Sequence, residues 1–107
     1  MEREKRRTPR YMFFASAELL EEKSEVRVAS RVSELSLHGC YLDMMNPFPT
    51  DTAIRLKIWT EENTVFLTKG TIIYSQPNMG AGVRFEEVEA KNLEVLKRWL
   101  EEAAKQS

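Results

Sequence analysis

The sequence predicts a mainly β protein, a small six-stranded antiparallel β-barrel followed by one C-terminal α-helix. Two patterns lead to this expectation. Six short segments alternate apolar with polar residues or are rich in β-branched and aromatic residues, and turn residues separate them. The end of the chain changes to the period of an amphipathic helix. Because a closed sheet removes the exposed edges of short strands, we expect a barrel rather than an open sheet.

Length and composition favour one globular domain. The chain has 107 residues, of which 42% are hydrophobic and 31% are charged. We expect a single domain over 1–107, with a flexible basic arm at 1–10, the barrel at 11–86 and the helix at 88–105. The sequence has no apolar run of membrane-spanning length, and it does not open on a signal peptide, so we expect a cytoplasmic protein. The single cysteine, Cys40, agrees with a reducing compartment.

The first half of the chain is expected to form three strands. Residues 11–20 are aromatic and small, and the polar residues 21–24 form a turn. Residues 26–32 place valines on one face and arginines on the other, which is typical of a half-buried strand. Residues 40–44 follow as the third strand. A loop at 46–51 then contains two prolines, which cannot take part in a central ladder.

The second half is expected to form three strands and the helix. Residues 54–59 alternate cleanly, and residues 65–75 are β-branched and aromatic, with Gly70 indicating a bulge or a bend. Residues 81–85 form the last strand. The helix carries an apolar stripe that needs a partner surface. The stripe consists of Leu93, Leu96, Leu100 and Ala103 or Ala104, with Val95 and Trp99 beside it.

Charge is concentrated at the N-terminus. Residues 1–10 hold five basic and two acidic residues, a net of +3, whereas the whole chain has a net charge of −1. Arg6 and Arg10 are four residues apart just before the first strand, with Arg7 beside them. Guanidinium groups bind phosphate oxygens in pairs and also stack on or pair with bases, so the arm is a candidate anion-binding segment. The alternative is a solvated tail.

The second candidate element is Glu34-x-Ser36-x-x-Gly39, between the second and third expected strands. A carboxylate can accept hydrogen bonds from the N1–H and N2–H₂ edge of guanine, and a hydroxyl can bind a phosphate or a base. We expect Gly39 to adopt a positive φ and to let the backbone approach a ligand. The plainer alternatives are an ion pair between Glu34 and Arg31 and a simple turn at Ser36 and Gly39.

Together the two motifs resemble the PilZ domain family. The resemblance rests on Arg-x-x-x-Arg, then acid-x-Ser-x-x-Gly followed by Cys-Tyr-Leu, and then residues 80–85 and the terminal helix. It implies a six-stranded barrel that binds cyclic di-GMP through Arg6, Arg7, Arg10, Glu34, Ser36 and Gly39. The family usually has Asp or Asn where this chain has Glu34, and the additional methylene alters the reach of the carboxylate.

The resemblance implies a signalling module that senses cyclic di-GMP and passes the signal to a protein effector, as a monomer or homodimer. The alternative is an adaptor that no longer binds nucleotide and works through protein contacts. We expect no enzyme, no cofactor and no metal, because one His and one Cys leave few catalytic or ligating sets. We expect no membrane insertion and no specific nucleic-acid binding. His38 is expected to be exposed, and Cys40 to be a core residue.

Overall fold

The computed structural model describes residues 8–106 and confirms the predicted fold class. Six strands precede one helix, and each predicted strand is present with its ends moved by at most three residues. The elements are β1 (Tyr11–Glu21), β2 (Arg27–Leu35), β3 (Gly39–Asp43), β4 (Ala53–Trp59), β5 (Val65–Gln76), β6 (Gly80–Glu86) and α1 (Ala90–Lys105).

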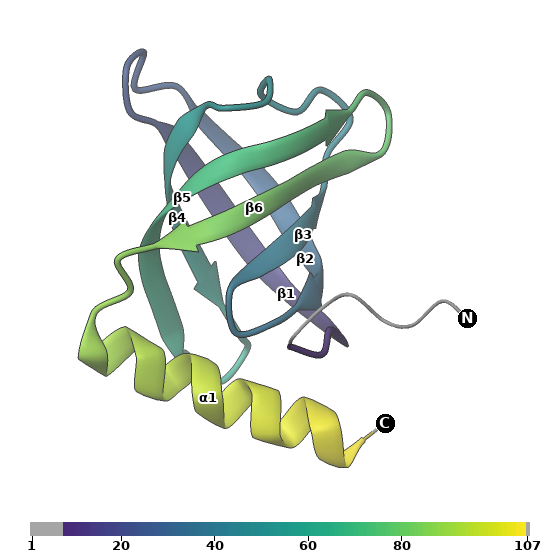
Figure 1. Ribbon diagram of the computed structural model, residues 1–107, viewed down its shortest axis with the longest axis vertical. Helices are drawn as coiled ribbons and strands as arrows, with labels where there is room; N and C mark the ends of the chain where they lie inside the picture. Colours follow the sequence, from purple (N-terminus) through teal and green to yellow (C-terminus); the bar gives the residue numbers. More distant parts are fainter. Residues whose placement is uncertain (1–7, 107) are drawn as a thin grey trace.

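The sheet closes into a barrel in the order β1-β2-β3-β6-β5-β4, and every neighbouring pair is antiparallel. Four of the six pairings are between consecutive strands. The other two, β1 with β4 and β3 with β6, join segments far apart in the sequence and close the barrel. Figure 1 shows α1 lying across one end of the barrel, next to the turn between β2 and β3 and the start of β1.

Alternation along the strands fills the barrel interior, as the sequence pattern predicts. In β4, for example, Ile54, Leu56 and Ile58 are buried while the residues between them are exposed. Gly70 is buried in β5, but the irregularity of this strand lies between Ile72 and Tyr74, so the expectation of a bulge at Gly70 is wrong. Gly70 instead leaves space inside the barrel, since a Cβ there would lie 2.7 Å from Cγ1 of Val83.

The helix docks on the barrel through the predicted apolar stripe. Leu96 and Trp99 are buried, and Ala103 rather than Ala104 completes the buried face. The Trp99 ring lies 5.2 Å from the ring of Phe13 in β1, measured between centroids. At the other end of the contact, the side-chain oxygen of the buried Asn92 accepts a hydrogen bond of 2.9 Å from the backbone N–H of Leu67 in β5. The helix therefore joins β1 to β5.

Candidate functional site

The turn between β2 and β3 is held together by Ser36. Its N–H and its hydroxyl both donate to the carbonyl oxygen of Gly39, at 2.9 and 3.2 Å. The hydroxyl also accepts a hydrogen bond of 3.3 Å from the N–H of His38, whose side chain is exposed as expected. Ser36 thus shapes the turn, which is the plainer of its two predicted roles. This does not test a role in binding, because a hydroxyl oxygen has a second lone pair.

Gly39 is required for a reason other than the one predicted. No described glycine has a positive φ, so the expected left-handed conformation of Gly39 is wrong. Gly39 begins β3 and lies opposite Arg84 of β6, where the two backbones are very close. A Cβ at Gly39 would lie 2.2 Å from the carbonyl oxygen of Val83. Glycine therefore permits close strand pairing here. Because Gly39 has no side chain, no side chain covers the backbone at this end of the turn.

A bulge in β2 directs Glu34 to the outer surface. The register shifts between Val32 and Glu34, so Ser33 and Glu34 both lie on the outside, between the buried Val32 and Leu35. Arg10, just before β1, lies next to Glu34, and its Nη1 is 3.7 Å from Oε1 of the carboxylate. Glu34 therefore pairs with Arg10 and not with Arg31.

The geometry joins the two predicted halves of the site. Positions 10 and 34 are brought together because β1 and β2 pair with Met12 opposite Glu34. Both side chains of the ion pair are nearly half exposed, at 44% and 45%. Exposed pairs of this kind contribute about 0–1 kcal/mol to stability, so a ligand can exchange these contacts at small cost. Arg6 and Arg7 lie outside the described residues.

Sequence reasoning missed two tyrosines that extend this surface. Tyr41 of β3 is the strand partner of Glu34, and its ring lies 6.0 Å from the ring of Tyr74 in β5, between centroids. The two rings lie over glycines of β6. A Cβ at Gly80 would come within 2.9 Å of the Tyr41 ring, and a Cβ at Gly82 would lie 2.5 Å from the Tyr74 ring. The sequence signal that could have predicted these rings is the Gly80-Ala81-Gly82 at the start of the last strand. Two glycines on one face of a strand leave a flat surface on which aromatic rings can lie.

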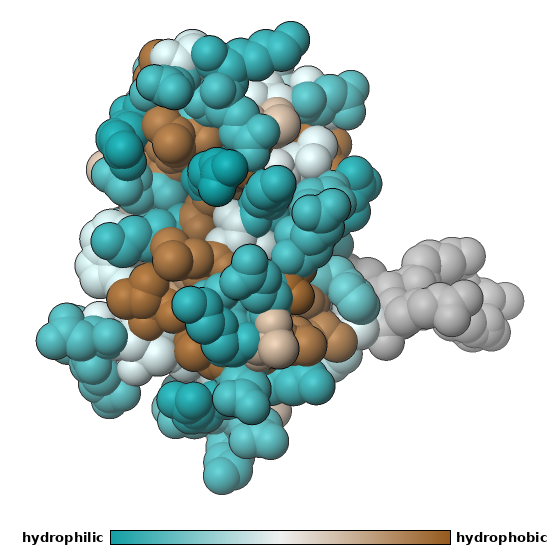
Figure 2. All heavy atoms as spheres, turned by 90° about the vertical axis from the view of Figure 1, so that its left-hand side faces the viewer, coloured by the Kyte–Doolittle hydropathy of each residue, from teal (hydrophilic) through white to brown (hydrophobic). Residues whose placement is uncertain are grey.

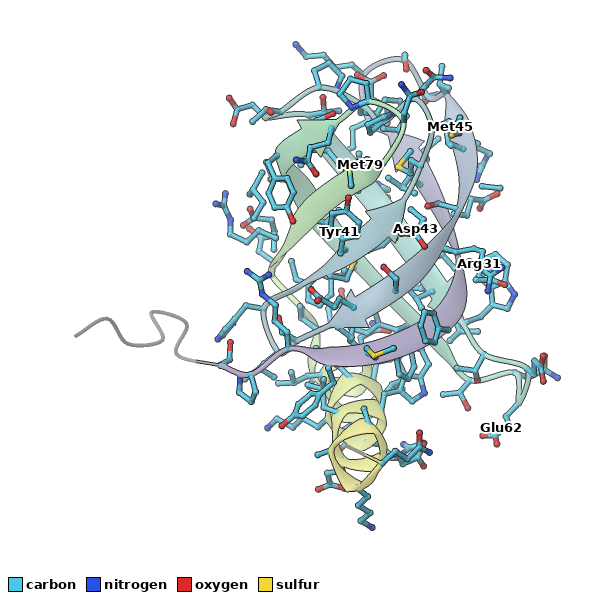
Figure 3. The ribbon with its side chains drawn as sticks, turned by 90° about the vertical axis from the view of Figure 1, so that its right-hand side faces the viewer. Arg31, Tyr41, Asp43, Met45, Glu62 and Met79 are labelled. Atoms are coloured by element: carbon cyan, nitrogen blue, oxygen red, sulfur yellow. The ribbon has the colours of Figure 1, made fainter. Side chains whose placement is uncertain are left out.

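The environment of Tyr41 disfavours its ionised form. Burial, Tyr74, Asp43 and Glu34, in decreasing order of effect, raise the pKa of the Tyr41 phenol. Tyr41 and Asp43 both lie on the outer face of the barrel in Figure 3, with Met79 and Met45 further toward the top of that view. The tyrosine surface thus runs from the Arg10–Glu34 pair along β3, and the phenol remains a hydrogen-bond donor.

Arg84 is the second cation near the turn. It lies on the exposed face of β6 opposite Gly39, and its Nη2 is 3.1 Å from Oε2 of Glu86. The same carboxylate oxygen accepts a hydrogen bond of 3.0 Å from the hydroxyl of Thr71. The hydrogen bond from Thr71 and, to a smaller extent, the contact with Arg84 lower the pKa of Glu86. Arg84 is therefore held in place by an anchored carboxylate beside the turn.

The described residues hold little that suggests catalysis. Cys40 is buried, and burial raises the pKa of its thiol far above the ordinary value, as expected for an inert core residue. Within residues 8–106, no group of three or more His, Cys, Asp or Glu side chains is placed to hold a metal. No helix in this part of the chain is long and apolar enough to cross a membrane.

A six-stranded barrel capped by a C-terminal helix, with an acid-x-Ser-x-x-Gly turn beside an arginine, defines a class of small β-barrel domains. The family described as PilZ domain matches this sequence over residues 4–102. Because the match covers nearly the whole chain, the protein belongs to the PilZ domain family. No curated protein matches it in sequence.

Solved structures with low sequence identity have the same fold. The PilZ domain of YcgR from Escherichia coli, with c-di-GMP, matches with a TM-score of 0.76 and 14% identity over 96% of this chain and 94% of that one. MotI (DgrA), an inhibitor of motility from Bacillus subtilis, matches with a TM-score of 0.75 and 13% identity over 96% of this chain and 53% of that one. The apo state of MrkH from K. pneumonia matches with a TM-score of 0.74 and 10% identity over 99% of this chain and 53% of that one. The chain therefore spans about half the length of the latter two proteins.

Proposed function

We propose that this protein is a cyclic di-GMP receptor that passes the signal to a protein effector and is not an enzyme. The contact between Arg10 and Glu34 supports the proposal best, since it unites the two motifs that the sequence separates by more than twenty residues. Membership of the PilZ domain family and the likeness to a YcgR domain with c-di-GMP agree with it. We place the protein in the cytoplasm, as the free and buried Cys40 suggests.

The ligand is expected to replace the Arg10–Glu34 pair. The guanidinium of Arg10 binds a phosphate, joined by Arg6 and Arg7 of the arm. The Glu34 carboxylate accepts hydrogen bonds from the N1–H and N2–H₂ groups of a guanine. The bare backbone at Gly39 admits the ligand close to the turn, and Ser36 contributes its hydroxyl. Tyr41 and Tyr74 supply a surface on which a base can stack.

Calorimetric titration with cyclic di-GMP tests this function. The parent is expected to bind with a saturable stoichiometry. Arg10→Ala is expected to weaken binding by about 1.5–3 kcal/mol, because it removes charge-assisted hydrogen bonds. A parent that takes up no cyclic di-GMP at high micromolar concentration would instead support an adaptor that works through protein contacts alone.

Variants at Glu34 test how guanine is recognised. Glu34→Ala is expected to weaken binding by about 1–3 kcal/mol and to narrow the preference for cyclic di-GMP over cyclic di-AMP. Glu34→Asp is expected to maintain or strengthen binding, because it restores the residue usual in the family. Glu18→Ala is the matched control, since Glu18 also forms an exposed ion pair, with Arg27 at 3.5 Å, but lies outside the site. Equal affinities in the parent and both Glu34 variants would contradict the guanine-binding role.

A further inference from the structure

A second surface feature is a groove of about 500 Å³ between the outer faces of β1, β4 and β5 and the start of α1. This volume is within the range of ligand-binding clefts. Figure 2 shows this side of the molecule, turned away from the tyrosine surface of Figure 3, and apolar side chains gather on it with hydrophilic ones around them. Accessible apolar surface in the groove comes from Leu20 and from Leu67, which is 49% exposed, whereas Leu56 at its floor is buried.

The groove is rich in cations without carboxylate partners. Of its five basic residues, Arg27 pairs with Glu18 at 3.5 Å and Arg55 pairs with Glu22 at 3.8 Å. The other three are Lys57, Lys69 and Lys91. Within the part of the chain that the structure describes, none of these three lysines has a carboxylate within 4.0 Å.

Two of the three lysines have further neighbours. The amino group of Lys57 lies 5.3 Å from the centroid of the Trp59 ring. Next to Lys91, the side chain of Glu89 at the N-cap of α1 makes no capping hydrogen bond. Within the described residues neither neighbour forms an ion pair with its lysine, so both ammonium groups are available to a ligand carboxylate.

The side chains that line the groove favour some kinds of binding partner over others. No aromatic residue lines the groove, whereas single-stranded nucleic acid is bound by stacking its bases on aromatic side chains. Three carboxylates, those of Glu18, Glu87 and Glu89, also line it, so a ligand that carries donors and apolar groups beside its negative charges fits better than a uniformly anionic phosphate backbone or membrane. A peptide can place acidic side chains on the lysines and apolar ones on the two leucines, and it also offers N–H groups to the carboxylates.

We propose that this groove binds an acidic peptide segment of a protein partner, with its carboxylates on Lys57, Lys69 and Lys91 and its apolar side chains on Leu20 and Leu67. The inference does not depend on nucleotide binding, because the groove shares no residue with the Arg10–Glu34 site. The groove would supply a docking surface whether this protein is a nucleotide receptor or an adaptor.

A random peptide library displayed on phage, selected against the whole protein, tests the proposal. The selected peptides are expected to be enriched in Asp and Glu together with Leu, Ile or Phe. Synthetic copies of them are expected to shift the amide NMR signals of β4, β5 and the start of α1. The triple variant Lys57→Ala, Lys69→Ala, Lys91→Ala is expected to bind these peptides at least tenfold more weakly, and Leu67→Ser also weakens them.

The control variant Lys23→Ala, Lys97→Ala, Lys105→Ala removes the same number of charges from exposed lysines outside the groove. It is expected to bind the peptides like the parent. Several results would overturn the proposal: selected peptides without an excess of acidic residues, equal losses in the two triple variants, or no selected peptide. Lysine-dependent binding of a single-stranded DNA oligonucleotide or of phosphatidylglycerol vesicles at this groove, in place of peptides, would overturn it as well.

Discussion

Replacement of Gly39 by alanine separates the structural role of this glycine from a role in ligand binding. The new Cβ would lie 2.2 Å from the carbonyl oxygen of Val83, whereas ordinary contacts begin at 3.4 Å, so β3 and β6 must separate by about 1.2 Å. The obstacle is backbone and cannot rotate away. The nearby hydrogen bond from the N–H of Phe85 to the carbonyl oxygen of His38, 2.8 Å long, lies in the region that must move.

The expected loss follows from the number of hydrogen bonds disturbed. Leaving a buried backbone group without a partner costs about 1–3 kcal/mol. Disturbing this bond and one neighbouring bond of the β3–β6 ladder is therefore expected to lower the free energy of unfolding by about 2–6 kcal/mol, a large part of the roughly 5–15 kcal/mol typical of a domain. Chemical denaturation measured by tryptophan fluorescence gives this value, and thermal unfolding is expected to shift to lower temperature with it.

Gly82→Ala is the matched control for this experiment. The three atoms nearest to its Cβ would all belong to the ring of Tyr74, a partly exposed side chain that can swing aside. We expect a loss of less than about 1 kcal/mol, as for other substitutions that displace a surface side chain. If Gly39→Ala were as stable as the parent to within about 0.5 kcal/mol, the argument from close strand approach would be refuted.

Two further predictions concern the helix and the tyrosine surface. Leu96→Asp places a charge at a fully buried position of α1 and is expected to cost several kcal/mol, to be measured by denaturation; unchanged stability would mean that the helix does not need the barrel. The pKa of Tyr41 is raised above the ordinary value of 10.0 by burial, Tyr74, Asp43 and Glu34. Because the folded state keeps the proton that the unfolded state loses, the contribution of Tyr41 to stability is complete below pH 10.0 and declines above it. Ultraviolet titration of the phenol is expected to show the raised pKa, and Asp43→Asn is expected to lower it; a Tyr41 that titrates at the ordinary value would contradict this.

The fold could be predicted because the spacing of apolar residues along each segment indicates which positions are buried. The alternation in residues 54–59 and the helical spacing of Leu96 and Trp99 each depend on a single element. Glu34, Ser36 and Gly39 could be singled out because they lie close together in the sequence, around the turn between β2 and β3. Whether they bind a nucleotide remains a prediction.

What the sequence did not predict depends on contacts between distant strands. The need for glycine at position 39 comes from the backbone of Val83, and the position of the β5 irregularity comes from pairing with β6. The surface formed by Tyr41 and Tyr74 depends on that same register. No local pattern specifies such distances, so the positive φ expected at Gly39 proved wrong, as did the bulge, one of the two alternatives expected at Gly70.

The strand order divides the barrel into two sequential meanders, β1–β2–β3 and β4–β5–β6, that meet along two seams. Each candidate surface extends across one seam, although the Arg10–Glu34 pair itself lies within the first meander. Gly39 and Arg84 face each other across the β3–β6 seam, while the peptide groove takes Leu20 from β1 and Lys57 from β4. Because the long-range pairings across the seams are the slow ones to form, neither surface is complete in an isolated half of the barrel. A ligand that bridges either seam would hold the two meanders together and slow their separation during unfolding.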